Sequence, residues 1–433
     1  MRVFLAAALA LAAQGAGAGQ TPTTDSVLAV NQAAAEAAQP SAVCADGLYR
    51  SPTGDLAALT TPLPPAETRQ RFTLLNGEQG EVDPKGLIAC RNGTVTDGAG
   101  AAWLKVQFRA TPTDFTGGGG VRLHGLLLEP LHPRGKPPLL VLVHGSEKTS
   151  PILRYSQLLL AGQGVSVFAY DKRGTSGSGG TYTQDFNVLA DDAAAAAGEA
   201  RRLAAGRFSR LGLEGGSQGG WVAPAAALKA RADFVEVAFG VVGTPLEQDQ
   251  WQVDYQLKEQ GFPDSILPMA HEVTDATAEV ARSDFSAHFD GLEQVRKAYG
   301  AEPWFAKIDG QYSGELLQGK IAQAKDESPQ VPWEYPAADV LRRLHIPQTW
   351  ILAQDDSVAP SAHTVERLKL LSKDGANIHI VIFPRVDHGI RLYTVDSEGK
   401  RHKYRVADGY FRLLADTAKG EPKPPYGDSV SAD

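Results

Sequence analysis

The stretch that decides the fold is 213–221, which reads Leu-Glu-Gly-Gly-Ser-Gln-Gly-Gly-Trp. It contains Gly-x-Ser-x-Gly, with a short apolar run before it that predicts a strand and a helical pattern over 218–230 after it. A tight strand-to-helix turn holds its serine in a strained backbone conformation, which small neighbours tolerate. The hydroxyl of Ser217 would project above the strand end, and the backbone N–H of Gln218 would point into the same space. The pattern therefore predicts Ser217 as a nucleophile rather than as part of a plain glycine-rich turn.

Apolar runs and helical patterns alternate on both sides of this turn. Continuous apolar runs predict strands that are buried on both faces of a sheet. Repeated strand–helix units imply a mostly parallel sheet covered by helices on both faces. The predicted class is therefore α/β. The predicted strands are 139–143, 165–170, 211–214, 234–242, 348–353 and 378–383, and the helices between them include 152–161, 185–205 and 218–230.

A serine hydroxyl is a poor nucleophile without a base, and the chain offers one downstream of Ser217. The predicted strand 378–383 runs into the turn Val-Asp-His-Gly, which contains His388. The predicted strand 348–353 runs into an acidic loop. Both loops are expected at the carboxyl ends of sheet strands, where open α/β sheets bind their ligands. We predict that His388 accepts the Ser217 proton and that an aspartate holds the imidazole, the alternative being a solvated loop histidine.

Together these motifs resemble those of bacterial α/β-hydrolases, over about residues 116–418. The similarity is to esterases and hydrolases akin to the prolyl-oligopeptidase and dienelactone-hydrolase groups. It implies an α/β-hydrolase fold, hydrolysis through a covalent acyl-enzyme, and no cofactor. The motifs are His-Gly-Ser at 144–146, Asp-Lys-Arg-Gly at 171–174, Gly-Gly-Ser-Gln-Gly-Gly-Trp at 215–221, the acid loop at 350–360 and Val-Asp-His-Gly at 386–389.

The resemblance also bears on the acid and on the oxyanion hole. Asp356, followed by Ser-Val-Ala-Pro, is the better match to the family's acid loop, although alanine replaces the usual glycine at 353. Asp355 is the rival, and Asp387 is disfavoured because side chains of sequence neighbours usually diverge from each other. Backbone N–H groups of Gln218 and Ser146 are expected to form the oxyanion hole, with Gly145 as the alternative to Ser146. The loop 171–177 is expected to buttress the site.

The start of the chain predicts export. Met1-Arg2, an apolar run and Ala-Gly-Ala at 16–18 match a secretory signal peptide, and the run is shorter than the ~20 apolar residues of a membrane span. We therefore expect cleavage after Ala18 and a secreted or periplasmic protein. In that oxidising compartment Cys44 and Cys90, the only two cysteines, are expected to form a disulfide, the alternative being two buried thiols.

Composition shifts divide the rest of the chain. Alternating runs separated by Asn-Gly and Asp-Gly turns predict a small β-rich domain ahead of the catalytic one. A long stretch with helical periodicity and many aromatics predicts a helical cap insertion. The expected organisation is a signal peptide at 1–18, a flexible leader at 19–42, a β-rich domain at 43–115, a catalytic domain at 116–418 with its cap at 246–340, and a disordered tail at 419–433.

Charge and motif content exclude several classes of function. The net charge of −8 comes without blocks of like charge, which gives no reason to expect nucleic-acid binding or stable membrane insertion. His271-Glu272 lacks the second histidine of a zinc motif, and the glycine-rich stretch 174–180 matches no nucleotide motif, so no metal or cofactor is expected.

The remaining choice concerns the substrate, because ester and peptide hydrolysis use the same acyl transfer. A peptidase of the prolyl-oligopeptidase type generally carries a large propeller, which 43–115 is too short to build. We predict a carboxylesterase-like serine hydrolase that acts on a small-molecule ester or short peptide. The alternatives are a serine exopeptidase and a non-catalytic secreted binding protein on a hydrolase scaffold.

Overall fold

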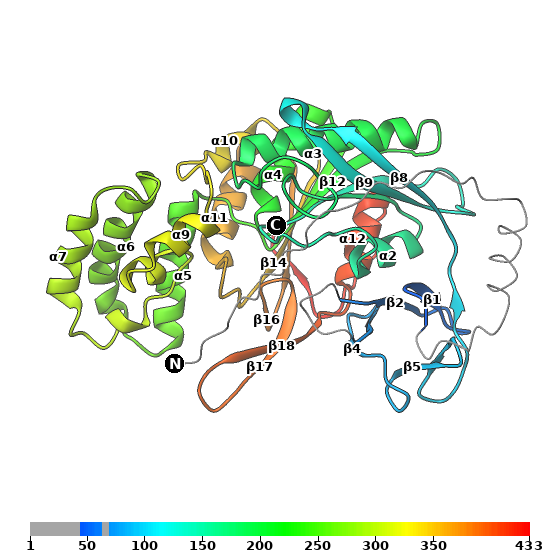
Figure 1. Ribbon diagram of the computed structural model, residues 1–433, viewed down its shortest axis with the longest axis horizontal. Coiled ribbons are helices and arrows are strands. Elements are labelled where there is room, and N and C mark those ends of the chain that lie inside the picture. The colour runs from blue at the N-terminus through cyan, green and yellow to red at the C-terminus, as the bar shows by residue number, and fades with distance from the viewer. Residues whose placement is uncertain (1–43, 63–68) are drawn as a thin grey trace, which may run out of the picture. The chain divides into compact units, whose positions relative to one another are not determined.

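A computed structural model of the chain describes residues 44–62 and 69–433 (Figure 1). The predicted signal peptide and leader lie outside the described residues. In the described part of the chain, no helix is long and apolar enough to cross a membrane.

A nine-stranded sheet organises the described residues, in the order β19-β15-β14-β13-β12-β10-β11-β9-β8. Its six central strands, β10 to β15, are parallel to one another, whereas β8, β9 and β19 pair in antiparallel fashion. The predicted α/β class and mostly parallel sheet are confirmed. The strands are β8 Phe108–Thr116, β9 Arg122–Pro130, β10 Leu139–Val143, β11 Ser166–Tyr170, β12 Leu211–Gly216, β13 Phe234–Ala238, β14 Gln348–Ala353, β15 Ile378–Phe383 and β19 Val430–Ser431.

Helices cover both faces of this sheet because successive side chains of a buried strand point to opposite sides. In β10, Val141 packs into the core under one set of helices and Leu142 into the core under the other. The first face carries α3 (Phe186–Leu203), α4 (Gly219–Ala230) and α11 (Ser361–Lys373), and the second carries α2 (Tyr155–Gly162) and α12 (Tyr410–Lys419). The two hydrophobic cores therefore sandwich the sheet.

The N-terminal region is a small antiparallel sheet that packs on α2. Leu48 and Leu56 of this sheet belong to the same core cluster as the α2 residues 158–161. The expected disulfide between Cys44 and Cys90 is present. The large sheet itself begins at Phe108, ahead of the predicted boundary at 116. The small sheet runs β4-β3-β2-β1-β7, with a separate β5-β6 hairpin; the strands are β1 Gly47–Arg50, β2 Leu56–Thr60, β3 Arg71–Leu74, β4 Gln79–Glu81, β5 Ile88–Arg91, β6 Thr94–Asp97 and β7 Leu104–Lys105.

Between β13 and β14, where every residue is described, the chain is helical and contains no strand. The first helix begins with a capping box in which Thr244 and Glu247 satisfy each other's backbone amides. Several aromatic side chains of this insertion pack into its own cores, with Tyr312 and Trp304 among the most buried, whereas Trp251 and Tyr335 join a core of the large sheet. Its elements are α5 Pro245–Glu259, η2 Asp264–Ile266, α6 Leu267–Arg282, α7 Phe289–Tyr299, η3 Phe305–Lys307, α8 Ser313–Leu317, α9 Ile321–Glu327 and α10 Ala337–Arg342.

The C-terminal region differs from the prediction in two places. A three-stranded sheet of β16 (Val386–Asp387), β17 (Arg391–Val395) and β18 (Arg401–Val406) follows β15 and was not predicted. The prediction of a disordered tail at 419–433 is wrong for its end, because β19 pairs with β15. An edge strand leaves backbone groups unpaired, and a short polar segment can pair with them without any apolar pattern of its own.

Candidate active site

Ser217 lies on the turn between β12 and α4, and the glycines around it are required by close backbone approach. Its φ of +53° is in the left-handed region, which costs energy for a residue with a Cβ atom. A Cβ atom on Gly215 would collide with the backbone of Gly219, and one on Gly219 would collide with the carbonyl of Val143. The Gly-x-Ser-x-Gly pattern is therefore the local sequence that permits this turn.

The structure brings Ser217, His388 and Asp356 into one chain of hydrogen bonds. The Nε2 atom of His388 is 3.0 Å from the Oγ atom of Ser217. On the other side of the ring, Nδ1 is 3.0 Å and 3.1 Å from the two carboxylate oxygens of Asp356. Asp356 is buried, and its Oδ1 atom accepts from the amides of Val358 and Ala359 at 3.0 Å and 2.7 Å, which fixes the carboxylate in place.

The two rival aspartates have other partners. Asp355 accepts a hydrogen bond from the Tyr393 hydroxyl at 3.1 Å. Asp387 is buried and accepts from the amide and hydroxyl of Ser357 and from the amide of His388, at 2.7–2.9 Å. Burial alone would raise the pKa of Asp387, but these hydrogen bonds and the charge of Lys403 hold it below its ordinary value. Asp387 therefore ties the acid loop to the histidine loop, a role that its place beside His388 did not reveal.

The loop that carries Ser146 passes against Ser217, since a Cβ atom on Gly145 would lie 3.3 Å from the Cβ atom of Ser217. Among the described residues, neither the backbone N–H of Ser146 nor the backbone N–H of Gln218 donates a hydrogen bond to the protein, whereas the side-chain amide of Gln218 donates to Gln184. Both predicted oxyanion donors are thus available to a ligand.

Lys172, from the Asp-Lys-Arg-Gly loop, joins these two donor residues. Its side chain is 4% exposed, and its Nζ atom donates to the carbonyl of Gly145 and, at 3.1 Å, to the Oε1 atom of Gln218. The Gly145 carbonyl and the Ser146 N–H belong to the same trans peptide unit and point in opposite directions. Lys172 therefore fixes the direction in which the Ser146 amide points, and the Tyr182 hydroxyl, donating to the Ser146 carbonyl at 2.7 Å, holds the next peptide. Burial lowers the pKa of Lys172 to about 8.

A cavity of about 610 Å³ opens beside Ser217. Its walls come from β12, from the helices α2 and α12, from β17, and from β2, β3 and β4 of the N-terminal sheet. The small β-rich region thus forms part of the candidate binding site. None of the described residues that line this cavity comes from 246–340. The aromatics of the insertion therefore do not shape this cavity.

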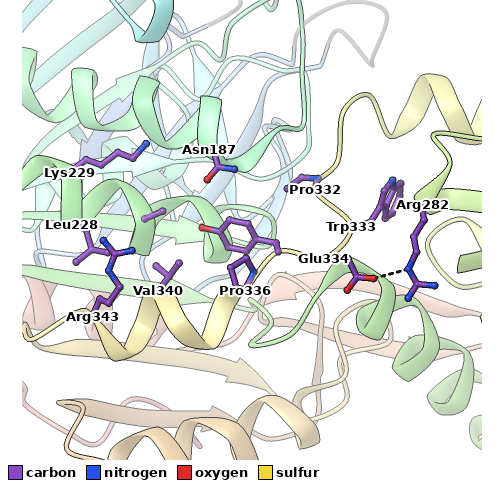
Figure 2. Close-up of a pocket in the computed structure, with 12 residues that line it drawn as sticks. Asn187, Leu228, Lys229, Arg282, Pro332, Trp333, Glu334, Pro336, Val340 and Arg343 are labelled. Carbon is purple, nitrogen blue, oxygen red and sulfur yellow. Dashed lines mark hydrogen bonds and ion pairs between the residues drawn. The ribbon is translucent and has the colours of Figure 1, made fainter. Parts of the chain in front are cut away.

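A second cavity, of about 790 Å³, lies elsewhere (Figure 2). It is lined by residues of α3, α4 and α10 and by the segment 332–336, and Figure 2 shows the Arg282–Glu334 ion pair at its edge, with a distance of 2.7 Å. Ser217 and His388 are not among its lining residues. No group of three or more His, Cys, Asp or Glu side chains in the described part of the chain is arranged to hold a metal ion.

Residues 136–304 match the family described as serine aminopeptidase, S33. A search of curated proteins finds no match.

Similar solved structures include an esterase of Pyrococcus furiosus, at 14% identity and a TM-score of 0.42, with 65% of this chain and 84% of that chain covered. They also include an acylaminoacyl peptidase of Pyrococcus horikoshii, at 17% identity and a TM-score of 0.42, with 80% and 46% covered. A puromycin hydrolase gives 17% identity and a TM-score of 0.42, with 86% and 49% covered. The strand order and the Ser217 turn are those of an α/β-hydrolase fold, and the match over residues 136–304 is to a family of hydrolases.

Proposed function

We propose that this protein is a serine hydrolase that cleaves an ester bond of a small-molecule substrate, with Ser217, His388 and Asp356 as its catalytic residues. The observation that carries the proposal is the continuous hydrogen-bond chain from Asp356 through His388 to Ser217, beside a cavity of about 610 Å³. Cavities of this size fit small-molecule ligands.

The chemistry follows from these positions. As the Ser217 oxygen attacks the ester carbonyl, His388 takes its proton, and Asp356 stabilises the imidazolium that forms. The amides of Gln218 and Ser146 donate hydrogen bonds to the oxyanion. His388 then protonates the departing alcohol, which leaves an acyl group on Ser217. Water, deprotonated by His388, attacks this acyl group and releases the acid.

A serine exopeptidase is the second candidate, and the match of residues 136–304 to a serine aminopeptidase family favours it. The same catalytic residues would serve a peptide carbonyl, with an amine as the leaving group. The two candidates therefore differ in substrate and not in site. A non-catalytic binding protein would retain the fold but would have no use for the strained backbone at Ser217.

The test is hydrolysis of p-nitrophenyl acetate and butyrate beside aminoacyl and prolyl p-nitroanilides, with Ser217→Ala as the control. We expect turnover of the esters that disappears in Ser217→Ala. Selective turnover of the anilides would instead establish the exopeptidase. Silence on every substrate, together with no labelling by a fluorophosphonate, would establish the non-catalytic alternative.

We also propose that the protein works outside the cytoplasm, in the periplasm or after secretion. The predicted signal peptide at 1–18 supports this, and the Cys44–Cys90 disulfide is compatible with an oxidising compartment. Cell fractionation with N-terminal sequencing tests it: we expect an extracytoplasmic protein that begins at Gly19, and a cytoplasmic protein that retains Met1 would contradict the proposal.

A further inference from the structure

Three arginines from distant parts of the chain line the cavity beside Ser217. Arg71 begins β3, Arg154 precedes α2, and Arg391 begins β17. Among the residues that the structure describes, none of the three forms an ion pair with a carboxylate; the Arg154 guanidinium donates to the carbonyls of Ser150 and Thr61. The cavity thus contains cationic groups whose charges the protein does not neutralise directly.

Of the three arginines, Arg391 is the one that has a buried donor without an acceptor among the described residues. One guanidinium nitrogen, Nη2, donates to the Oε1 atom of Gln79 at 2.8 Å, while the Nε atom is buried and has no acceptor in the described structure. A guanidinium has five N–H donors, and a buried donor without an acceptor is costly. Arg401, on the neighbouring strand β18, shows the contrast: its guanidinium contacts Glu259, the Tyr255 hydroxyl and the Asp355 carbonyl.

Two carboxyl groups also line the cavity, but they do not cancel this charge. Burial, with the nearby Glu147, raises the pKa of Glu214 to about 8, so that near pH 7 most Glu214 side chains are protonated and neutral. Glu147 is half exposed, and its Oε1 atom lies 3.5 Å from the Nδ1 atom of His144. Burial lowers the pKa of His144 to about 3, so its ring is neutral. The charged groups that remain are three arginines and one glutamate.

We propose that Arg391 binds a carboxylate on the acyl chain of the substrate, so that the enzyme acts on esters whose acyl chain ends in an acid group. A carboxylate in the cavity would accept from the Nη atoms of Arg391 in the two-pronged geometry that guanidinium groups favour. The acyl chain is the appropriate part of the substrate because it stays attached to Ser217 through both chemical steps, beside the cavity. This inference rests on the proposed function of Ser217.

The experiment compares two p-nitrophenyl esters of the same length: the monoester of adipic acid, and the same ester with its distal carboxylate replaced by a neutral carboxamide. The quantity measured is the ratio of their kcat/KM values near pH 7, corrected for spontaneous hydrolysis. We expect the wild-type ratio to favour the carboxylate by about tenfold or more, as for a hydrogen bond between charged groups. In Arg391→Met the ratio should fall to about one.

A matched control removes a positive charge elsewhere. Arg342 lies exposed on α10, where it pairs with Asp339, and Arg342→Met should keep the wild-type ratio. Arg391→Lys keeps the charge but not the two-pronged geometry, so an intermediate ratio is expected. It also serves as the test if thermal unfolding shows that Arg391→Met does not fold.

Two outcomes would overturn the inference: a wild-type ratio of one or below, or a high ratio that survives in Arg391→Met. These failures remain distinct from failure of the proposed function. If the neutral ester is turned over and a fluorophosphonate labels Ser217, only the carboxylate preference is lost. If neither ester is turned over and no label attaches, the proposed function itself is wrong, and the inference with it.

Discussion

Two cavities can be compared: one of about 790 Å³ against α3, α4 and α10, and one of about 610 Å³ beside Ser217. They differ less in size than in whether their polar groups have partners within the protein. In the larger one, Lys229 pairs with Asp191, Arg282 pairs with Glu334 as Figure 2 shows, and Arg343 is exposed to solvent. In the smaller one, Ser217 has a positive φ, and the Nε atom of Arg391 has no acceptor among the described residues.

This difference shows how to choose between cavities when no ligand identifies one. A paired charge is already stabilised by the protein and gains little from a ligand, whereas strained or unpartnered groups persist only where the rest of the fold compensates for them. Such groups cluster at functional sites. The smaller cavity is therefore the candidate site, although the larger one has more room.

The largest effect should come from removing the nucleophile or its base. Ser217→Ala and His388→Ala should each reduce ester turnover by a factor on the order of 10⁴ or more, because neither residue can act without the other. The measurement is kcat with the best p-nitrophenyl ester of the panel. Near-normal turnover in either variant would remove the smaller cavity from the role of active site.

Replacement of Asp356, the proposed partner of His388, should have the next largest effect on kcat. Asp356→Asn should lower kcat by a factor on the order of 10³ or more, because an amide cannot stabilise the imidazolium of His388. Asp355→Asn is the matched control, since the Asp355 side chain accepts from Tyr393 instead, and it should lower kcat by less than about tenfold. If Asp355→Asn were the more damaging change, the role of the acid would pass to Asp355.

Loss of the Lys172 side-chain charge should have a smaller effect. Lys172→Met should lower kcat by roughly 10- to 100-fold with little change in KM, because the amides of Ser146 and Gln218 would lose their fixed orientation toward the oxyanion. The ammonium form of Lys172 predominates below its pKa of about 8 and is lost above it. Wild-type turnover should therefore decline above pH 8, whereas Lys172→Arg should stay charged and retain its rate there. An unchanged kcat in Lys172→Met would show that the oxyanion loop keeps its shape without this contact.

The smallest effect should come from filling the larger cavity. Val340 lines the larger cavity, shown in Figure 2, and Ser217 does not. Val340→Trp would therefore place a large side chain in that cavity without touching the Ser217 turn. We expect kcat/KM to change by less than about twofold, with some loss of thermal stability from overpacking. A drop of tenfold or more, in a variant that unfolds at the wild-type temperature, would show that the larger cavity takes part in the reaction.

Much of the catalytic domain could be predicted because its signals are local. The predicted strands 139–143, 348–353 and 378–383 coincide with β10, β14 and β15, since strands buried on both faces are continuous apolar runs. The predicted helix 185–205 differs from α3 by a few residues at its ends, where helices fray. The Asp185 side chain caps α3 by accepting from the amides of Asn187 and Val188.

The misses are elements whose positions depend on contacts remote in sequence, although β16, β17 and β18 pair with one another locally. The end of the tail pairs with β15, and its polar composition predicts a strand no better than a loop. The sheet of β16, β17 and β18 carries Arg391 to the cavity, where it meets Gln79, 312 residues away. No periodicity records a contact of that kind.

By itself, the sequence determined the turn at Ser217, because only glycine permits the backbone to approach so closely on either side, and it determined that His388 follows a strand of the same sheet. The tertiary structure alone decided which of three nearby aspartates contacts the His388 ring, because that depends on directions set by hydrogen bonds to Val358, Ala359 and Ser357. It also decided that the N-terminal sheet forms part of the cavity wall and that Lys172 donates a hydrogen bond to the carbonyl of Gly145. Local conformation follows from steric limits and periodicity in adjacent residues, whereas the surroundings of an active site are assembled from segments that only the folded chain brings together.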